Sequence, residues 1–547
     1  MSPKHRRPGR QSLTRSSWFL GSLLIAAVVA LPLGAVLWGL LAPATDAWRH
    51  IQDTLLLRYI GNTLWLLLGS LAGAVAVGSA LAWFVTAYDF PGRRWLTVGL
   101  VLPIAIPPYI GASTYASIVG YTGPIQVWLR RLSIEVPPGS LDIMNTPGAI
   151  AIFTLFLYPY VYLVVRGFLH LQAGQLVEAA AMLGSSRAEL YWRIVLPLTR
   201  PAVVAGGTLV AFEVLSDYGV VSYYGLHVFS TAIFKSWQGL HDISSAMKLS
   251  ALLLVVVTLV LVGERTLRGS GRYSYASPRI RPLAVVPATG LRRVLIVVIT
   301  HGVFWSAIII PVAQMIYWAV VSWHSIDLKP LAGAWWTSLW LGLVGAALTT
   351  VFAVIVTNHR RLWPDWASAM FSRIAALGYS IPSTVIALSI LSIFVGIEAV
   401  TGKTLVLSPV VVVLAYLVRY LAVSLQSVES GFERIGKRYT ESARMLGNGP
   451  WRALLRVDAP LLRAALLGAF LLSFIDIVKE LPIVLILRPF NFTTLSTTVF
   501  QYAHDEMIPE SSLASLLIIV LTIIPTAIIM GRRVRSDAAS PAEGGQQ

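Results

Sequence analysis

Twelve stretches of the sequence are apolar for long enough to cross a lipid bilayer, and this feature constrains the fold most. A membrane-spanning helix needs about 20 mostly apolar residues. Of the 547 residues, 56% are hydrophobic and only 12% are charged, whereas soluble domains carry about 25% charged residues. The sequence therefore predicts an all-α, polytopic membrane protein. The expected spans are 18–41, 59–87, 95–120, 147–170, 200–222, 246–263, 294–322, 335–357, 369–397, 407–428, 461–487 and 512–530.

A basic, proline-containing stretch divides these spans into two sets of six. With both termini in the cytoplasm, most of the 42 Lys and Arg residues lie in inner loops, as the positive-inside rule requires. The net charge of +17 therefore indicates orientation and disfavours nucleic-acid binding. The expected organisation is a basic N-terminus (1–17), a first half (18–263), a linker (264–293), a second half (294–530) and a cytoplasmic tail (531–547).

The two halves share sequence landmarks, which indicates an internal duplication. Residues 178–184 recur as 441–447, and Pro197 recurs as Pro460, both at an offset of 263. Pro107 and Pro382 are offset by 275, so the first half is expected to carry about twelve extra residues, in the outer loop near 121–146. Because each half has six spans, both halves run in the same direction and form a parallel repeat.

The repeated segment carries the most specific motif of the chain. Residues 178–197 fit Glu-Ala-Ala-x3-Gly-x9-Ile-x-Leu-Pro at every position, which resembles the EAA motif of ABC importer permeases. The resemblance implies short helices that dock on cytoplasmic ATPase subunits. The glycine is expected to end a helix in the left-handed conformation, and the proline to stop the second element. Two matching copies disfavour an ordinary amphipathic loop. The expected coupling residues are Glu178, Ala179, Ala180, Gly184 and Pro197, with Glu441, Ala443, Gly447 and Pro460 in the second copy.

The chain is not expected to hydrolyse ATP. Gly396 to Thr404 looks like a phosphate-binding loop, but five residues separate its glycines where that loop needs four. ATP and Mg²⁺ are therefore expected on a separate ATPase subunit, with no cofactor on this chain. The absence of cysteine excludes disulfides and thiolate metal sites.

Acidic residues inside apolar spans are costly and mark functional sites. Two acid pairs stand 263 residues apart, and the i, i+4 spacing within each predicts carboxylates on one helix face. We expect them to line the pathway and to favour a hard cation in transient contact, without a stored metal. Structural pairing with Lys479, or a position at a helix end, is the alternative. The candidates are Glu213, Asp217, Asp476 and Glu480.

Longer stretches resemble the ferric-iron permease family of ABC importers. They are Leu-Pro-Ile-Ala-Ile-Pro-Pro-Tyr (102–109), Gly-Tyr-Thr-Gly-Pro (120–124), Asp-Tyr-Gly-Val-Val-Ser-Tyr-Tyr-Gly (217–225) and residues 479–492. The resemblance implies a bacterial inner-membrane protein, a homodimeric ATPase and a periplasmic iron-binding protein. Thiamine and phosphonate-type anions are alternative substrates of related permeases. An ion-coupled secondary transporter also fits two sets of six spans, but the twin coupling motifs disfavour it. A membrane enzyme would need clustered catalytic groups or metal ligands, and the nine histidines are scattered without such spacing.

Overall fold

The computed structural model describes residues 9–134, 136–137, 139–172, 193, 195–268, 285–406 and 408–539. Eleven helices in these ranges are long and apolar enough to span a membrane, and a bent helix pair would make twelve. The prediction of an all-α membrane protein is therefore confirmed. One short exception is a parallel pairing of β1 (Tyr88–Asp89) with β2 (Val286–Pro287).

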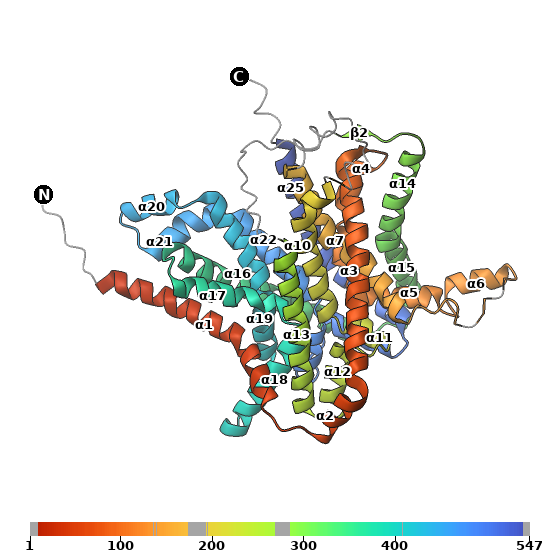
Figure 1. The fold of residues 1–547 in the computed structure, drawn as a ribbon, viewed down its shortest axis with the longest axis horizontal. Coiled ribbons are helices and arrows are strands. Elements are labelled where there is room, and N and C mark those ends of the chain that lie inside the picture. Colours follow the sequence, from red (N-terminus) through yellow and green to blue (C-terminus); the bar gives the residue numbers. More distant parts are fainter. Residues whose placement is uncertain are drawn as a thin grey trace. The chain divides into compact units, whose positions relative to one another are not determined.

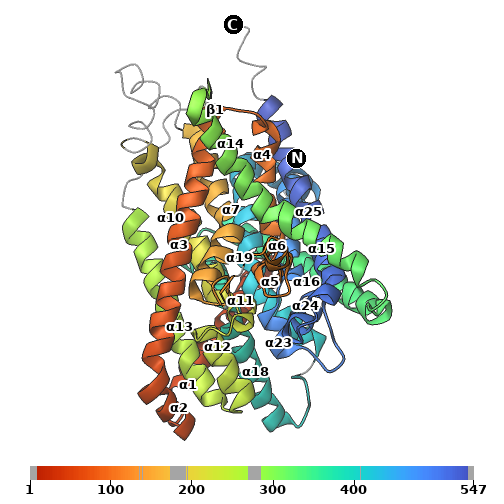
Figure 2. The same ribbon diagram turned by 90° about the vertical axis from the view of Figure 1, so that its right-hand side faces the viewer.

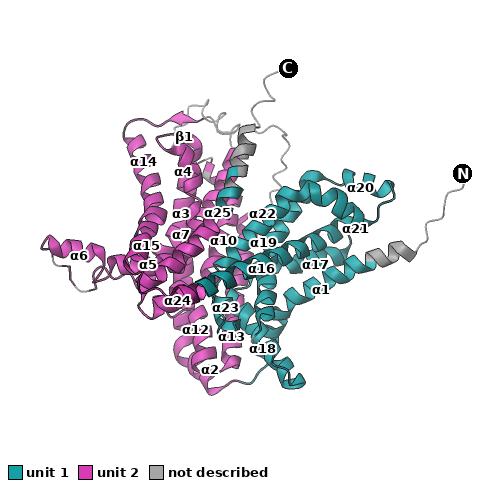
Figure 3. Cartoon of the chain, turned by 180° about the vertical axis from the view of Figure 1, so that it is seen from behind, with its two compact units in different colours: residues 1–43, 332–495, 524–547 teal, residues 44–331, 496–523 magenta. Residues whose placement is uncertain are grey.

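The described chain forms two compact units, 1–43 with 332–495 and 524–547, and 44–331 with 496–523 (Figure 3). These units do not coincide with the sequence halves. The first span of the chain belongs to the unit that holds most of the second half, and residues 290–321 belong to the other unit. Residues 264–268 of the expected linker are helical, and 269–284 lie outside the described residues.

The 44–331 unit contains most elements of the first half and the first helices of the second half. They are α2 (Asp46–His50), a π-helix (Ile51–Leu55), α3 (Leu56–Ala87), α4 (Arg93–Gly99), a 3₁₀ turn (Leu102–Ala105), α5 (Pro108–Val119), α6 (Pro124–Arg131), α7 (Thr146–Gln172), α10 (Leu196–Ser216), α11 (Gly219–Tyr223), α12 (Phe229–Phe234), a π-helix (Lys235–Gly239), α13 (Ile243–Arg268), α14 (Gly290–Phe304), a π-helix (Trp305–Ile309) and α15 (Ile310–Val321). Most of α24 (Leu495–His504) also lies there.

The other unit contains α1 and most of the second half. Its elements are α1 (Gly9–Leu40), α16 (Leu328–Leu362), α17 (Trp366–Leu377), a 3₁₀ turn (Gly378–Ser380), α18 (Ser383–Thr401), α19 (Pro409–Ile435), α20 (Arg438–Met445), α21 (Pro450–Ala453), a π-helix (Leu454–Asp458), α22 (Ala459–Val478) and α23 (Pro482–Leu487). The last helix, α25 (Ile508–Ala539), contributes residues to both units.

Helix boundaries confirm the internal duplication. The starts of α7 and α19, at 146 and 409, differ by 263, as do the starts of α11 and α23, at 219 and 482. The starts of α5 and α18, at 108 and 383, differ by 275. The extra residues of the first half therefore lie between α5 and α7, where α6 forms.

Glycines allow α3 and α7 to pack closely, and both side views show them side by side (Figures 1 and 2). A Cβ on Gly69 would lie 2.5 Å from Ile150, and one on Gly73 would lie 2.2 Å from the Thr154 hydroxyl. Small residues one helical turn apart give membrane helices this close approach. The two glycines thus allow the close packing of α3 against α7 in the 44–331 unit.

In the other unit, α1 packs on elements that follow it by more than 300 residues. Trp18 is fully buried and stacks on Trp451, with ring centroids 4.2 Å apart. Ile25 and Val29 join the same apolar cluster with Leu425 of α19. The first span is therefore held by ordinary apolar burial, which is roughly proportional to buried area.

The predicted span 95–120 is not one straight helix. The helical stretches 93–105 and 108–131 meet at an angle of 94°, with Ile106 in an extended conformation before Pro107. A residue that precedes proline avoids the α-helical conformation, so the proline motif accounts for the break. The equivalent break in the other unit lies at Gly378–Pro382, where a Cβ on Gly378 would lie 1.8 Å from the Val418 carbonyl oxygen.

Candidate functional site: the 438–460 segment and the acid pairs

The 438–460 segment forms the helix and turn expected of the second EAA-like copy. Helix α20 ends at Met445, and Gly447 has φ +89°. The N–H of Gly447 donates to the Arg444 carbonyl (3.0 Å), and the N–H of Asn448 donates to the Ala443 carbonyl (3.2 Å). These two bonds define a Schellman motif, in which a left-handed glycine satisfies the last carbonyls of a helix. The predicted left-handed glycine is confirmed.

The expectation that Pro460 stops the second element is wrong. Helical backbone runs from Pro450 through the π-helix 454–458 into α22, and Pro460 lies in the first turn of α22. Proline lacks an N–H, and its ring crowds the carbonyl four residues earlier. A π turn, which is wider than an α turn, accommodates the ring without ending the helix.

The turn presents two large apolar side chains to the exterior of its unit. Met445 is 87% exposed and Leu446 is 84% exposed, while Ala443 is buried against the unit. Glu441 is exposed in the first turn of α20. We call Met445 and Leu446 the apolar tip; α20 and α21, which flank it, appear at the end of the α19 and α22 pair (Figure 1).

The first EAA-like copy lies mostly outside the described residues. This applies to Glu178, Ala179, Ala180 and Gly184. Pro197 lies in the first turn of α10, at the position that Pro460 takes in α22.

The two acid pairs do not lie on one helix face, which corrects that prediction. Helix α10 ends at Ser216, so Glu213 is helical and Asp217 is not, and α22 ends at Val478, two residues before Glu480. The Asp217 Oδ1 atom accepts from the N–H of Val220 (2.9 Å). In the same way Glu480 Oε1 accepts from the N–H three residues on, that of Ile483 (3.2 Å).

The second acid of each pair therefore accepts a hydrogen bond from the first turn of the short helix that follows. An acidic side chain at this position satisfies free N–H groups and favours the helix dipole. The remaining acid of the second pair, Asp476, forms an ion pair with Lys479 (2.9 Å), and the Tyr420 hydroxyl donates to Glu480. Both contacts belong to the structural alternative. The convergence of the four carboxylates on a pathway stays a prediction.

A buried arginine beside Glu480 was missed from the sequence. Arg419 of α19 is only 2% exposed, and its Nη1 donates to the carbonyls of Tyr379 (2.6 Å) and Ile381 (2.5 Å). These carbonyls lie in the break between α17 and α18. Irregular backbone within a membrane needs internal partners, and Arg419 supplies them. A charge within the apolar run 409–421 was the available signal.

Outside the membrane-spanning segments, the Asp242 carboxylate accepts hydrogen bonds from several donors. Burial acts to raise the pKa of its carboxyl group, but hydrogen bonds from Ser245 and Thr45 outweigh burial and lower the pKa below 3.8. Thr45 Oγ1 lies 2.5 Å from Oδ2, and Ser245 Oγ lies 2.6 Å from the same atom. Asp242 thereby ties the start of α2 to the start of α13.

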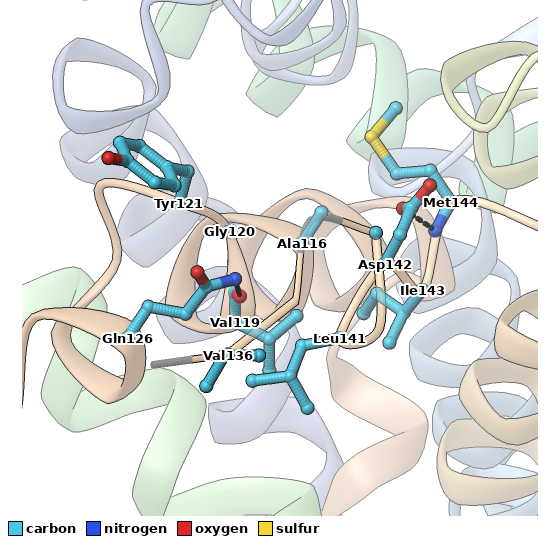
Figure 4. Close-up of a pocket in the computed structure, with 11 residues that line it drawn as sticks. Ala116, Val119, Gly120, Tyr121, Gln126, Val136, Leu141, Asp142, Ile143 and Met144 are labelled. Carbon is cyan, nitrogen blue, oxygen red and sulfur yellow. Dashed lines mark hydrogen bonds between the residues drawn. The ribbon is translucent and has the colours of Figure 1, made fainter. Parts of the chain in front are cut away.

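The inserted segment between α5 and α7, together with the end of α5, lines an open pocket of about 390 Å³ (Figure 4). Two of its polar side chains, Gln126 and Asp142, are hydrogen-bonded to nearby backbone. Gln126 donates to the Val119 carbonyl (2.8 Å), and Asp142 accepts from the Met144 N–H (2.8 Å). These side chains therefore stabilise the loop, and they do not indicate a ligand site.

The fold and the repeated segments define a class of protein, a multi-pass helical membrane protein with two homologous halves. Residues 74–268 and 349–535 match the family model described as the binding-protein-dependent transport system inner membrane component. The chain belongs to this family, with the domain present twice. It is a multi-pass inner-membrane permease of an ABC importer.

Relatives differ in the substrates that their names give. The chain is 25% identical over 515 residues to the Fe(3+)-transport system permease protein FbpB 2 of Haemophilus influenzae, covering 92% of this chain and 97% of that protein. It is 29% identical over 257 residues to the sulfate transport system permease protein CysT of Escherichia coli, covering 45% and 89%. CysW of Escherichia coli, also a sulfate permease, is 25% identical over 40% of this chain and 74% of that protein.

Proposed function

We propose that this permease imports ferric iron, delivered by a periplasmic binding protein and driven by two copies of a separate cytoplasmic ATPase subunit. The observation that supports ferric iron as the substrate is the match to the iron-permease relative, which covers 92% of the chain. Each sulfate relative covers less than half of the chain. Both termini are proposed to lie in the cytoplasm. No metal is stored in the pathway.

The 438–460 segment is proposed to dock on one ATPase subunit through the apolar tip. Met445 and Leu446 recur in sequence as Met182 and Leu183 of the first copy, which suits docking on a symmetric ATPase pair. Lys437 directly precedes the 438–460 segment, which also carries the basic residues Arg438 and Arg444. The surface it fits is an apolar cleft with an acidic rim, because complementary charge guides association and apolar cores supply affinity.

Transport is proposed to follow alternating access. ATP binding closes the ATPase pair, and the docked segments pass that motion to the helices that follow them, α10 and α22. Only a difference in affinity between inward-facing and outward-facing states can couple ATP to this change. Glu213, Asp217, Asp476 and Glu480 are proposed to guide the cation, since carboxylates suit hard metals.

The docking proposal is tested by the variants Met445→Asp and Leu446→Asp in purified permease. Each is expected to weaken ATPase-subunit binding at least tenfold, because a charge replaces an apolar contact. Val400→Asp is the matched control, since Val400 is also 87% exposed but lies in the last turn of α18. Normal ATPase binding by both tip variants would contradict docking through the tip.

Sulfate is the second candidate substrate, because two relatives are named sulfate permeases. Thiamine and phosphonate-type anions remain further alternatives. The test is uptake of labelled ferric iron and labelled sulfate by a strain that lacks this chain and then regains it. Iron uptake is expected to fall and recover with the chain. Unchanged iron uptake together with a defect in sulfate uptake would contradict ferric iron and indicate sulfate as the substrate.

A further inference from the structure

A buried ion pair joins the 438–460 segment to the end of α16. Arg361, in the last turn of α16, and Asp458, at the end of the π-helix, approach to 3.4 Å between Nη1 and Oδ1. Their side chains are 8% and 1% exposed. The Thr440 hydroxyl of α20 donates to the same carboxylate oxygen at 2.6 Å. A charge pair this deeply buried needs such additional hydrogen bonds to offset its desolvation.

Arg361 also connects the pair to the end of α19. Its Nη2 donates to the Gly436 carbonyl, and its guanidinium lies 4.7 Å from the centre of the Phe432 ring. We call Arg361, Asp458, Thr440 and Gly436 the Arg361 node. The node joins four pieces of chain: the end of α16, the end of α19, helix α20 and the π-helix that leads into α22.

The first half has different residues at the corresponding positions. The 263 offset places Val177 and Val195 where Thr440 and Asp458 stand, and the 275 offset places Thr86 where Arg361 stands. The second offset holds at this point because α3 ends at Ala87 and α16 ends at Leu362. The first half thus has no charged residue at these positions, with valine where Thr440 and Asp458 stand and threonine where Arg361 stands.

The comparison between the halves indicates that the charges of the Arg361 node are not required for the fold of a permease half. Replacing a buried ion pair by apolar residues of similar size is often neutral or stabilising, whereas removing one partner is costly. Conformational specificity is one attested reason to retain such a pair. At this place the conformation specified is the position of α20 relative to three helices that enter the membrane.

We propose that Arg361 and Asp458 are positioning residues that make α20 move as one body with the ends of α16, α19 and α22. The proposal rests on the proposed function, in which the tip of α20 receives the ATPase motion. The fixed geometry transmits that motion to the spans. Without the node, α20 still binds the ATPase but shifts relative to the helices that it should move.

The experiment uses the full permease with its ATPase subunits and binding protein, reconstituted in liposomes. The test variant is the double substitution Arg361→Met and Asp458→Val, which removes both charges together, as in the uncharged first half. The matched control is Arg360→Met with Glu429→Gln, an adjacent ion pair of 2.8 Å whose side chains are 46% and 36% exposed. ATPase-subunit binding, ATP hydrolysis and solute imported per ATP are measured for each.

The double variant is expected to bind the ATPase subunits within about twofold of wild type and to hydrolyse ATP. Its solute imported per ATP is expected to fall at least fivefold, while the control keeps the wild-type ratio. Arg361→Lys, with Asp458 kept, is expected to import more solute per ATP than the double variant and less than wild type. Lysine keeps the positive charge but lacks the second guanidinium donor. A merely structural role would lower hydrolysis and uptake in proportion.

Two results would overturn the proposal: an unchanged ratio of solute imported per ATP, including a proportional loss of hydrolysis and uptake, or a loss of ATPase binding itself. Failure of the proposed function is distinguishable from each. In that case the wild-type permease would itself show no ATPase binding or no ATP-driven uptake.

Discussion

Gly447 gives the sharpest prediction, because the position of the apolar tip depends on its conformation. Its φ of +89° lies in the left-handed region, which costs a residue with a Cβ about 1–2 kcal/mol. In Gly447→Ala, this cost favours an ordinary helical or extended backbone at residue 447. The left-handed turn that presents the apolar tip then becomes less populated. Since 1.4 kcal/mol is a factor of ten, ATPase binding is expected to weaken about 5- to 30-fold.

The assay is the dissociation constant of the purified ATPase subunit for permease in lipid nanodiscs. Gly447→Asn is expected to lose less than Gly447→Ala, because asparagine tolerates the left-handed region better than alanine does. Gly449→Ala is the matched control, since Gly449 has φ −69° and open space around its would-be Cβ. The reasoning is refuted if Gly447→Ala binds like wild type, or if Gly449→Ala weakens binding equally.

Three further predictions concern stability, measured as the thermal midpoint in nanodiscs. Gly73→Val forces a side chain into the 2.2 Å gap before Thr154 and is expected to destabilise by about 1–3 kcal/mol; Gly263→Ala, in open space, should not destabilise, and equal effects would contradict close packing. Arg419→Met leaves the buried Ile381 carbonyl and the partly buried Tyr379 carbonyl without this donor, which is expected to destabilise by about 1–3 kcal/mol for the buried one; an unchanged midpoint would contradict the proposed role of Arg419. The folded-state pKa of Asp242 is lowered, so its stabilisation is present above pH 3.8 and is lost as the pH falls through that lowered pKa. Asp242→Asn should therefore have a lower midpoint near pH 6 and approach wild type in strong acid, and a difference that persists there would contradict the assignment.

Local chemistry allowed much of the fold to be predicted. Spans of about 20 apolar residues are visible in a sequence because lipid excludes charge, and the duplication followed from recurring landmarks. The left-handed Gly447 was predictable because glycine after a helical stretch commonly ends it in this way.

Features that depend on tertiary partners could not be read from the pattern. The i, i+4 spacing of Asp476 and Glu480 suggested a continuous helix, but Glu480 lies beyond the end of α22 and accepts from the first turn of α23 instead, and a carboxylate can serve either role. The packing of α1 with the second half depends on which of several similar apolar faces accepts it. The pairing of Arg361 with Asp458 spans almost 100 residues, and no local signal links the two.

The central claim is that this chain moves ferric iron across the membrane when a docked ATPase hydrolyses ATP. The most direct measurement is accumulation of labelled ferric iron in liposomes that contain the permease and its ATPase subunits, with the iron-loaded binding protein outside and ATP inside. The claim predicts uptake that requires both ATP and the binding protein and that falls at least tenfold in Met445→Asp. Iron accumulation without ATP, or ATP-driven accumulation of labelled sulfate in place of iron, would contradict it.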